Sequence, residues 1–210
     1  MAERKLTKAE QERLDFFYKK SKELEAQGYV SKPLTVSIVK ANTVSMLYGF
    51  LVSLPFIILF NITSRNTNAF KEGENYFRNN LLFFIFMIAS IVIHELIHGA
   101  TWSLFTKDGF KSIAFGVIWK SLNPYCTCKE TLSYRHYFLG LIMPCVILGI
   151  IPCIISLFNH NLWFFIFGVY NIFAASGDLM IGKLLLSNKN SDALYLDHPT
   201  DIGLVCFEKR

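Results

Sequence analysis

Two histidines and a glutamate lie within five consecutive residues, His94-Glu95-Leu96-Ile97-His98. On a helix, residues four apart lie on the same face, so the imidazoles of His94 and His98 can reach one metal ion. Imidazole nitrogens bind Zn²⁺, and the intervening Glu95 is placed to act as a general base on an activated water. The spacing predicts a zinc-dependent hydrolytic site. The alternative is that these polar residues only join neighbouring helices by hydrogen bonds.

Catalytic zinc usually takes three protein ligands, so a third must come from elsewhere in the chain. Asp178 is the prominent ionisable residue of a later apolar segment, at a depth within about 4 to 5 Å of that of His94. We expect Asp178 to be the third ligand. Asn171, seven residues earlier on the same helical face, is expected to orient a ligand or bind substrate backbone. Asp197 and His198 are the alternative source of the third ligand.

The composition indicates a membrane protein. Of the 210 residues, 52% are hydrophobic and 18% are charged, whereas a soluble domain carries about 25% charged residues. Four apolar segments are each near or above the roughly 20 residues that a helix needs to cross a bilayer. They run from Val44 to Ile62, Leu81 to Phe105, Phe138 to Phe158 and Leu162 to Leu186. The five cysteines, an odd number, exclude a complete set of intrachain disulfides.

The Lys and Arg residues predict the direction of these spans. Nine lie in the arm that ends at Lys40, 3 in the loop after the first span, 5 in the loop after the second, and 4 at the end of the last span and in the tail. Because cytoplasmic loops are enriched in Lys and Arg, both termini are predicted to be cytoplasmic, in the cell membrane. Anionic lipid headgroups then account for the net charge of +5, and no nucleic-acid partner is expected.

The predicted fold is an all-α membrane fold of four transmembrane helices. Residues 1–43 are expected to form a cytoplasmic segment with an amphipathic helix, lying on the membrane surface or against the bundle. Residues 44–186 form the transmembrane domain, and residues 187–210 form a cytoplasmic tail. The loop 109–135 is predicted to contain a small membrane-associated β-hairpin. Its edge, at Ile113, is expected to receive an extended substrate as an added strand.

Four stretches of the chain carry a resemblance to a known family. They are His94–Gly99, Asn123–Glu130, Ser176–Leu179 and Asp197–Pro199. In these stretches the chain resembles the bacterial membrane family known as "putative zincin peptidases", which implies a zinc peptidase.

The arrangement is also similar to that of site-2 proteases, which cleave membrane-embedded substrates with an intramembrane HExxH and an aspartate from a later helix. That similarity implies His94, His98 and Asp178 as ligands and Glu95 as the base. One departure is that Leu179 follows the aspartate, and the Asn-Pro stretch ending in Asp-Gly is absent.

These observations favour an intramembrane zinc-dependent metalloprotease that cleaves membrane-embedded or membrane-associated proteins near the cytoplasmic face. Its expected cofactor is Zn²⁺, and its expected partners are the lipid bilayer and a membrane protein or peptide substrate. The alternative is a non-catalytic metal-binding membrane scaffold or immunity-type protein, against which Glu95 argues because a structural site needs no base. A transporter with a titrating Asp178 is disfavoured by the lack of an internal repeat. The sequence predicts no oligomeric state.

Overall fold

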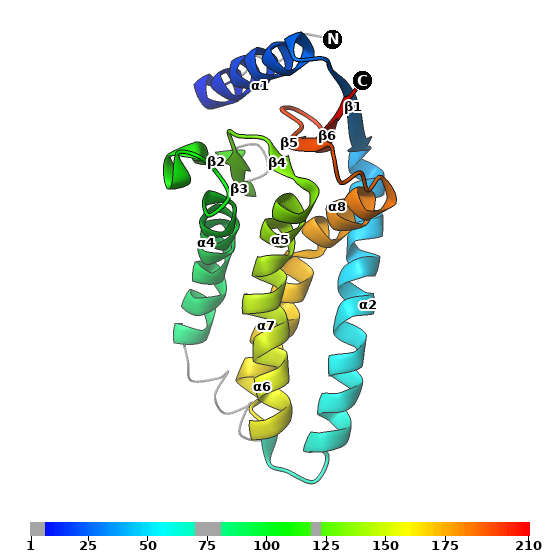
Figure 1. Ribbon diagram of the computed structural model, residues 1–210. Helices are drawn as coiled ribbons and strands as arrows, with labels where there is room; N and C mark the ends of the chain where they lie inside the picture. The colour runs from blue at the N-terminus through cyan, green and yellow to red at the C-terminus, as the bar shows by residue number, and fades with distance from the viewer. Residues whose placement is uncertain (1–6, 70–80, 119–122) are drawn as a thin grey trace.

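A bundle of apolar helices carries a small β-sheet at one end (Figure 1). The computed structural model describes residues 7–69, 81–118 and 123–210. Three helical stretches are long and apolar enough to cross a membrane, namely α2 (Ile38–Ser64), α4 (Leu81–Ser103) and the stretch Tyr134–Asn159. A bent pair of helices is a fourth candidate. The expectation of a mostly helical, multi-pass membrane protein is therefore confirmed.

Two of these spans begin earlier than predicted, because a serine caps each helix. The Ser37 side chain accepts a hydrogen bond from the backbone N–H of Lys40, so α2 begins at Ile38 rather than at Val44. Ser133 caps the third span in the same way. Serine oxygens at this position satisfy backbone N–H groups that the helix itself leaves unpaired.

The third span is a helix of three parts. Its first part is α5 (Tyr134–Pro144), its middle is a π-helical segment (Cys145–Ile150), and its last part is α6 (Ile151–Asn159). The π-helical segment follows Pro144 directly, and proline lacks the backbone N–H that a regular α-helix would use.

The fourth span is broken, which corrects the expectation of one continuous helix from Leu162 to Leu186. It consists of α7 (Leu162–Ala174) and α8 (Ser176–Ser187), whose axes differ by 50°. Neither helix is long enough to cross a bilayer core alone. The break lies at Ala175, and it changes how Asp178 reaches the bundle interior.

A four-stranded antiparallel sheet closes one end of the bundle, so the expectation of an all-α fold is wrong in this respect. Its strand order is β1-β6-β5-β4, and the C-terminus lies beside it (Figure 1). The strands are β1 (Tyr29–Val36), β6 (Ile202–Lys209), β5 (Leu194–Asp197) and β4 (Leu132–Ser133). The segment before the spans and the segment after them thus share one sheet, in which Tyr29 pairs with Lys209.

The sheet is buried on both faces, which explains why the sequence analysis did not predict strand β6. On β6, Leu204 and Cys206 face the bundle, while Val205 and Phe207 face the opposite side. A strand covered on both faces shows a continuous apolar run instead of alternating polar and apolar residues. Strand β1 was not predicted either, because it contains Pro33, and proline argues against a strand. Proline is tolerated there because β1 is an edge strand.

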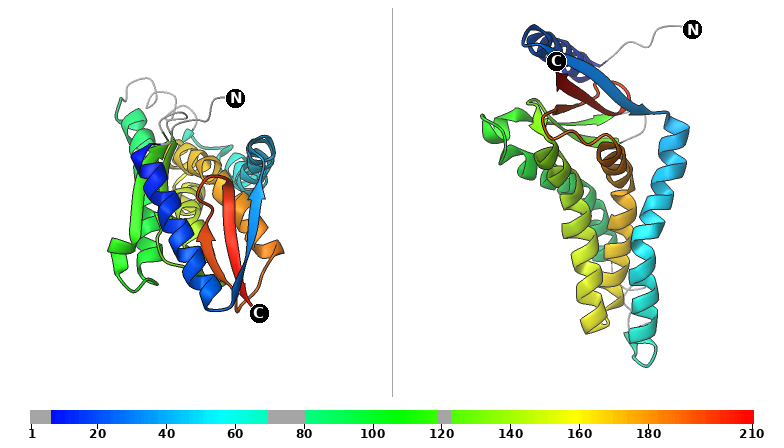
Figure 2. Two further views of the ribbon diagram at one scale, coloured as in Figure 1. Left: turned by 90° about the horizontal axis from the view of Figure 1, so that it is seen from above. Right: turned by 45° about the vertical axis from the view of Figure 1, so that its right-hand side comes forward.

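Helix α1 (Lys8–Ala26) covers the outer face of the sheet (Figure 2). Thr7 and Glu10 form a capping box at its N-terminal end. Leu24 and Phe17 pack against apolar residues of β5 and β6. The helix therefore lies on the sheet, and its apolar face is occupied by protein.

The predicted hairpin is confirmed. Strand β2 (Ile113–Ile118) pairs with β3 (Asn123–Cys128) in antiparallel register, with Ile113 opposite Cys128. A short 3-10 helix, η1 (Gly109–Ser112), leads from α4 into β2. The hairpin crosses α4 at Gly99, where an added Cβ would lie 2.6 Å from the Phe115 ring and 2.9 Å from Ile113. A glycine is needed for this close approach.

Candidate metal centre

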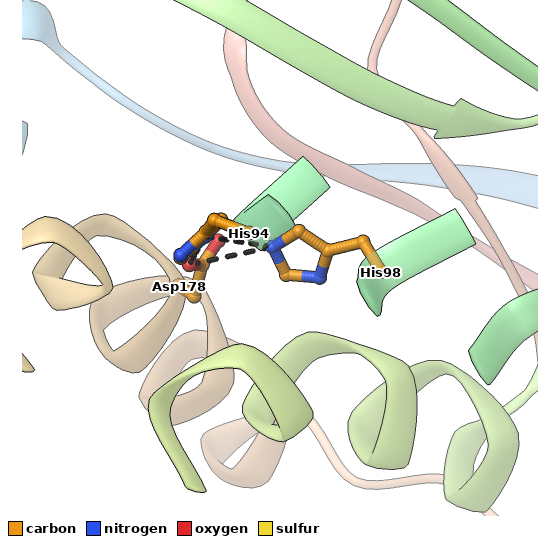
Figure 3. A group of neighbouring side chains, drawn as sticks. All are labelled: His94, His98 and Asp178. Atoms are coloured by element: carbon orange, nitrogen blue, oxygen red, sulfur yellow. Dashed lines mark hydrogen bonds and ion pairs between the residues drawn. The ribbon is translucent and has the colours of Figure 1, made fainter. Parts of the chain in front are cut away.

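His94, His98 and Asp178 converge on one point between α4 and α8 (Figure 3). The His94 Nε2 and His98 Nε2 atoms are 3.1 Å apart. The Asp178 Oδ2 atom lies 3.0 Å from His94 Nε2 and 3.5 Å from His98 Nε2. Both histidines are buried. The structure thus brings together the three residues that the sequence analysis selected as metal ligands.

These distances fit a tetrahedral zinc site. With bonds of about 2.0 to 2.2 Å, two ligand atoms on one tetrahedral Zn²⁺ lie about 3.3 to 3.5 Å apart. The three separations of 3.0, 3.1 and 3.5 Å are close to that value. Two imidazoles and a carboxylate also match the ligand types of catalytic zinc, which leaves a fourth position open for water or substrate.

The orientation of His98 is set by its second ring nitrogen. His98 Nδ1 lies 2.8 Å from the carbonyl oxygen of Gly140 on α5, and since a carbonyl only accepts, Nδ1 must carry the proton. Nε2 is then the unprotonated nitrogen and can bind a metal. The His98 ring also stacks on Trp102, at 5.2 Å between centroids.

The helix break delivers Asp178 to the cluster. Asp178 lies in the first turn of α8, where a negative charge is favoured by the helix dipole. The expectation that it projects from a continuous helix in phase with Asn171 is wrong, because the chain bends at Ala175 between them. Asn171 is buried, and its side-chain amide donates to the Phe167 carbonyl oxygen of its own helix.

A cleft of about 370 Å³ opens onto the cluster and holds Glu95 in its wall. The other walls come from α2, β3, α5, the end of α7, α8, β5 and the first residue of β6. The Glu95 carboxylate interacts with the backbone N–H of Cys126 on β3. The cleft is near the sheet end of α4, since His94 is nine residues, or about 13 to 14 Å, from the end of that helix at Ser103.

The two predicted substrate-binding residues do not line this cleft. Asn171 lies in α7 among buried residues, and Ile113 packs on α4 at Gly99. The cleft instead presents Asn42 of α2 and Cys126 of β3. Asn42 lies before the predicted start of its span at Val44, so no pattern in the sequence connected it with the histidines.

The alternative ligands of the tail have other roles. The Asp197 carboxylate accepts a hydrogen bond of 2.5 Å from the Tyr137 hydroxyl, and burial raises the pKa of Asp197. His198 Nδ1 accepts hydrogen bonds from the backbone N–H groups of Thr200 and Asp201, which closes the turn between β5 and β6. Neither residue belongs to the His-His-Asp cluster.

Three or four apolar helices around a His-His-Asp cluster whose histidines are buried define a multi-pass membrane protein with a candidate metal centre. The chain belongs to the family described as "Putative zincin peptidase", whose model matches residues 81–193. The expected family membership is confirmed, and the family implies zinc and peptidase activity. No curated protein and no solved structure matches the chain. The similarity to site-2 proteases stays a prediction.

Proposed function

We propose that this protein is a zinc-dependent peptidase that cleaves membrane-embedded or membrane-associated proteins near the cytoplasmic face. The observation that carries the proposal is the meeting of His94 Nε2, His98 Nε2 and Asp178 Oδ2 in a cleft that also contains Glu95. A purely structural metal site would have no use for an open cleft or for a carboxylate beside its ligands.

Each of these residues of the cleft has a separate role in the proposed reaction. His94, His98 and Asp178 hold the metal, and the Gly140 carbonyl oxygen keeps the His98 ring in its binding orientation. Bound Zn²⁺ would lower the pKa of a water toward about 7 and polarise the scissile carbonyl. Glu95 accepts the proton of the attacking water and delivers it to the leaving amine.

The outward edge of β3 is the proposed docking edge for an extended substrate. The Lys129 N–H donates to the Ser112 carbonyl oxygen at 2.7 Å, and this pairing fixes the alternation along the hairpin. Cys126 and Cys128 therefore direct their backbone groups away from β2. Cys128 faces the Asp197 carboxylate, and Cys126 faces Glu95. The proposed edge thus moves from Ile113 to Cys126.

The proposed location is the cell membrane, with the sheet on the cytoplasmic side. The Lys and Arg distribution supports this orientation, since 18 of the 21 then face the cytoplasm. The cleft lies near that end of α4, so water has a short path to Glu95.

Metal content and hydrolysis test the proposal together. We expect about one zinc per chain, by mass spectrometry of the purified protein, in the wild type and in Glu95→Gln. His94→Ala and Asp178→Ala should lose the zinc, whereas the exposed-residue control Asp192→Ala should keep it. Glu95→Gln should cleave quenched transmembrane peptides in vesicles about 10² to 10⁴ times more slowly than the wild type.

Two results would contradict the proposal in different ways. Zinc that is bound equally by the wild type and Asp178→Ala would remove Asp178 from the ligand set. Zinc bound as expected, with no hydrolysis by the wild type over a broad peptide library, would favour the non-catalytic metal-binding scaffold.

A further inference from the structure

Three apolar side chains on the hairpin and the turn before it are exposed and contiguous. Phe115 and Val117 alternate with Gly116 on β2, so both point to the same face of the strand. They are 42% and 40% exposed. The Phe110 ring, in η1, lies 5.8 Å from the Phe115 ring. We call Phe110, Phe115 and Val117 the apolar wedge.

The wedge continues the exposed apolar surface of α4. Phe115 contacts α4 at Gly99, which is four residues, or about 6 Å, inside the end of that helix at Ser103. Val92 and Leu96 are exposed and lie on one row of α4, because they are four residues apart. Leu104, which directly follows the end of that helix, is exposed as well. Figure 1 shows β2 and β3 beside the sheet end of α4.

Basic side chains flank the wedge. Lys107 and Lys111 are exposed on either side of Phe110, and no salt bridge joins them to an acidic side chain in the described part of the chain. The nearby Glu130 carboxylate is occupied by the Ser112 hydroxyl and by the backbone N–H groups of Lys107 and Asp108. Lys107 attracts the Glu130 carboxylate electrostatically, but neither lysine is held in a salt bridge in the described residues, so both ammonium groups can contact an external anion.

We propose that the apolar wedge inserts into the interfacial layer of the bilayer beside α4, with Lys107 and Lys111 on anionic lipid headgroups. Aromatic and aliphatic side chains next to lysines are typical of such interfacial segments. The insertion would hold the outward edge of β3 at the depth where a substrate chain leaves the apolar core of the bilayer. The inference does not depend on hydrolysis, so it can fail or hold independently of the peptidase activity.

Two valines allow a matched test. Val117 and Val30 are both strand residues with 40% exposure, but Val30 lies on β1 in the sheet, away from α4. Each is replaced by cysteine, labelled with a nitroxide and placed in full-length protein in vesicles of phosphatidylcholine and phosphatidylglycerol. The rate at which the label collides with oxygen, which partitions into lipid, is compared with the rate at which it collides with a water-soluble nickel complex. Labelled wild-type protein gives the background from the native cysteines, four of which are buried.

The label at Val117→Cys should collide mainly with oxygen and the label at Val30→Cys mainly with the nickel complex. Replacing Lys107 and Lys111 with glutamine should raise the nickel collisions at position 117, and this change should disappear in vesicles of phosphatidylcholine alone. Equal nickel collisions at both positions would overturn the proposal. The proposal would also be overturned if the spectrum of the label at position 117 were broadened by a label on a second copy. Such broadening would decrease on addition of unlabelled protein, and it would mean that a second copy covers the wedge.

A second variant guards against a folding artefact. A benzoylphenylalanine in place of Phe110 should crosslink to lipid on illumination, which mass spectrometry detects as a lipid adduct. Crosslinks only to protein, in chains that retain the wild-type helix content by circular dichroism, would also overturn the proposal.

Discussion

At the scale of single residues, the metal-binding orientation of His98 depends on a glycine of another helix. Gly140 supplies the carbonyl oxygen that accepts from His98 Nδ1, and α5 approaches so closely there that an added Cβ would lie 2.1 Å from Trp102 Nε1. The i, i+4 spacing of the histidines was sufficient to predict that their imidazoles meet. The dependence on Gly140 was not predictable, because it arises from the packing of α4 on α5.

Gly140→Ala should weaken zinc binding about 10- to 100-fold, the usual effect of losing the partner that orients a ligand. The Cβ would displace Trp102, on which the His98 ring stacks, or separate α5 from α4 and lengthen the hydrogen bond to His98. Competition with a chelator measures the affinity. Gly177→Ala is the matched control, since it adjoins Asp178 but its Cβ would meet nothing within 4 Å. Equal losses in both variants would refute this role of Gly140.

At the scale of elements, the break between α7 and α8 decided which sequence predictions held. Asp178 lies in the first turn of the helix that starts after the break and reaches the cluster, whereas Asn171 lies before the break and does not, because helical phase is lost at Ala175. Ser176, Gly177 and Asp178 are residue types that favour a helix start, and this was a usable indication of a new N-terminus within the apolar segment. Apolar length alone cannot distinguish a continuous span from a bent one.

The stability of the turn between α4 and the hairpin should depend on pH through Glu130. Partial burial would raise the pKa of Glu130, but hydrogen bonds from the Ser112 hydroxyl and from the N–H groups of Lys107 and Asp108 lower it below its ordinary value of 4.5. A lowered pKa in the folded state means that Glu130 stabilises the turn above pH 4.5. This contribution is lost as the pH falls through the lowered pKa.

Glu130→Gln should therefore loosen this turn at neutral pH, because an uncharged amide cannot accept from three donors as well as a carboxylate does. We expect roughly three- to tenfold lower hydrogen-exchange protection of the Lys107 and Asp108 amides. The difference from the wild type should shrink as the pH falls through the lowered pKa of Glu130, because the carboxylate itself then becomes protonated. An undiminished difference at low pH would show that the carboxylate charge is not the cause.

At the scale of the whole molecule, the sheet joins the two ends of the chain, and this was the largest omission of the sequence analysis. The hairpin was predictable because β2 and β3 are close in sequence and have a turn between them. The pairing of β1 with β6 connects segments that are separated by every span, and no local pattern reports such a pairing.

The sheet also makes a prediction about topology. Because β1 and β6 pair, we expect both termini to lie on one side of the membrane, and the Lys and Arg distribution predicts that this side is the cytoplasm. Green fluorescent protein fused to either terminus should fluoresce, and alkaline phosphatase fused there should be inactive. Alkaline phosphatase inserted after Arg65, in the loop beyond α2, should be active. The opposite pattern would place the cleft on the outer side.

The pairing of β1 with β6 also sets an order of assembly during synthesis. Strand β1 leaves the ribosome before the first span and must wait for its partner until all of the spans have been made. The inner face of the sheet packs with Trp102 and Tyr137 over the cluster end of the bundle, so this end is closed late in biogenesis. A nascent chain would therefore carry its histidines into the bilayer well before the wall contributed by β5 exists.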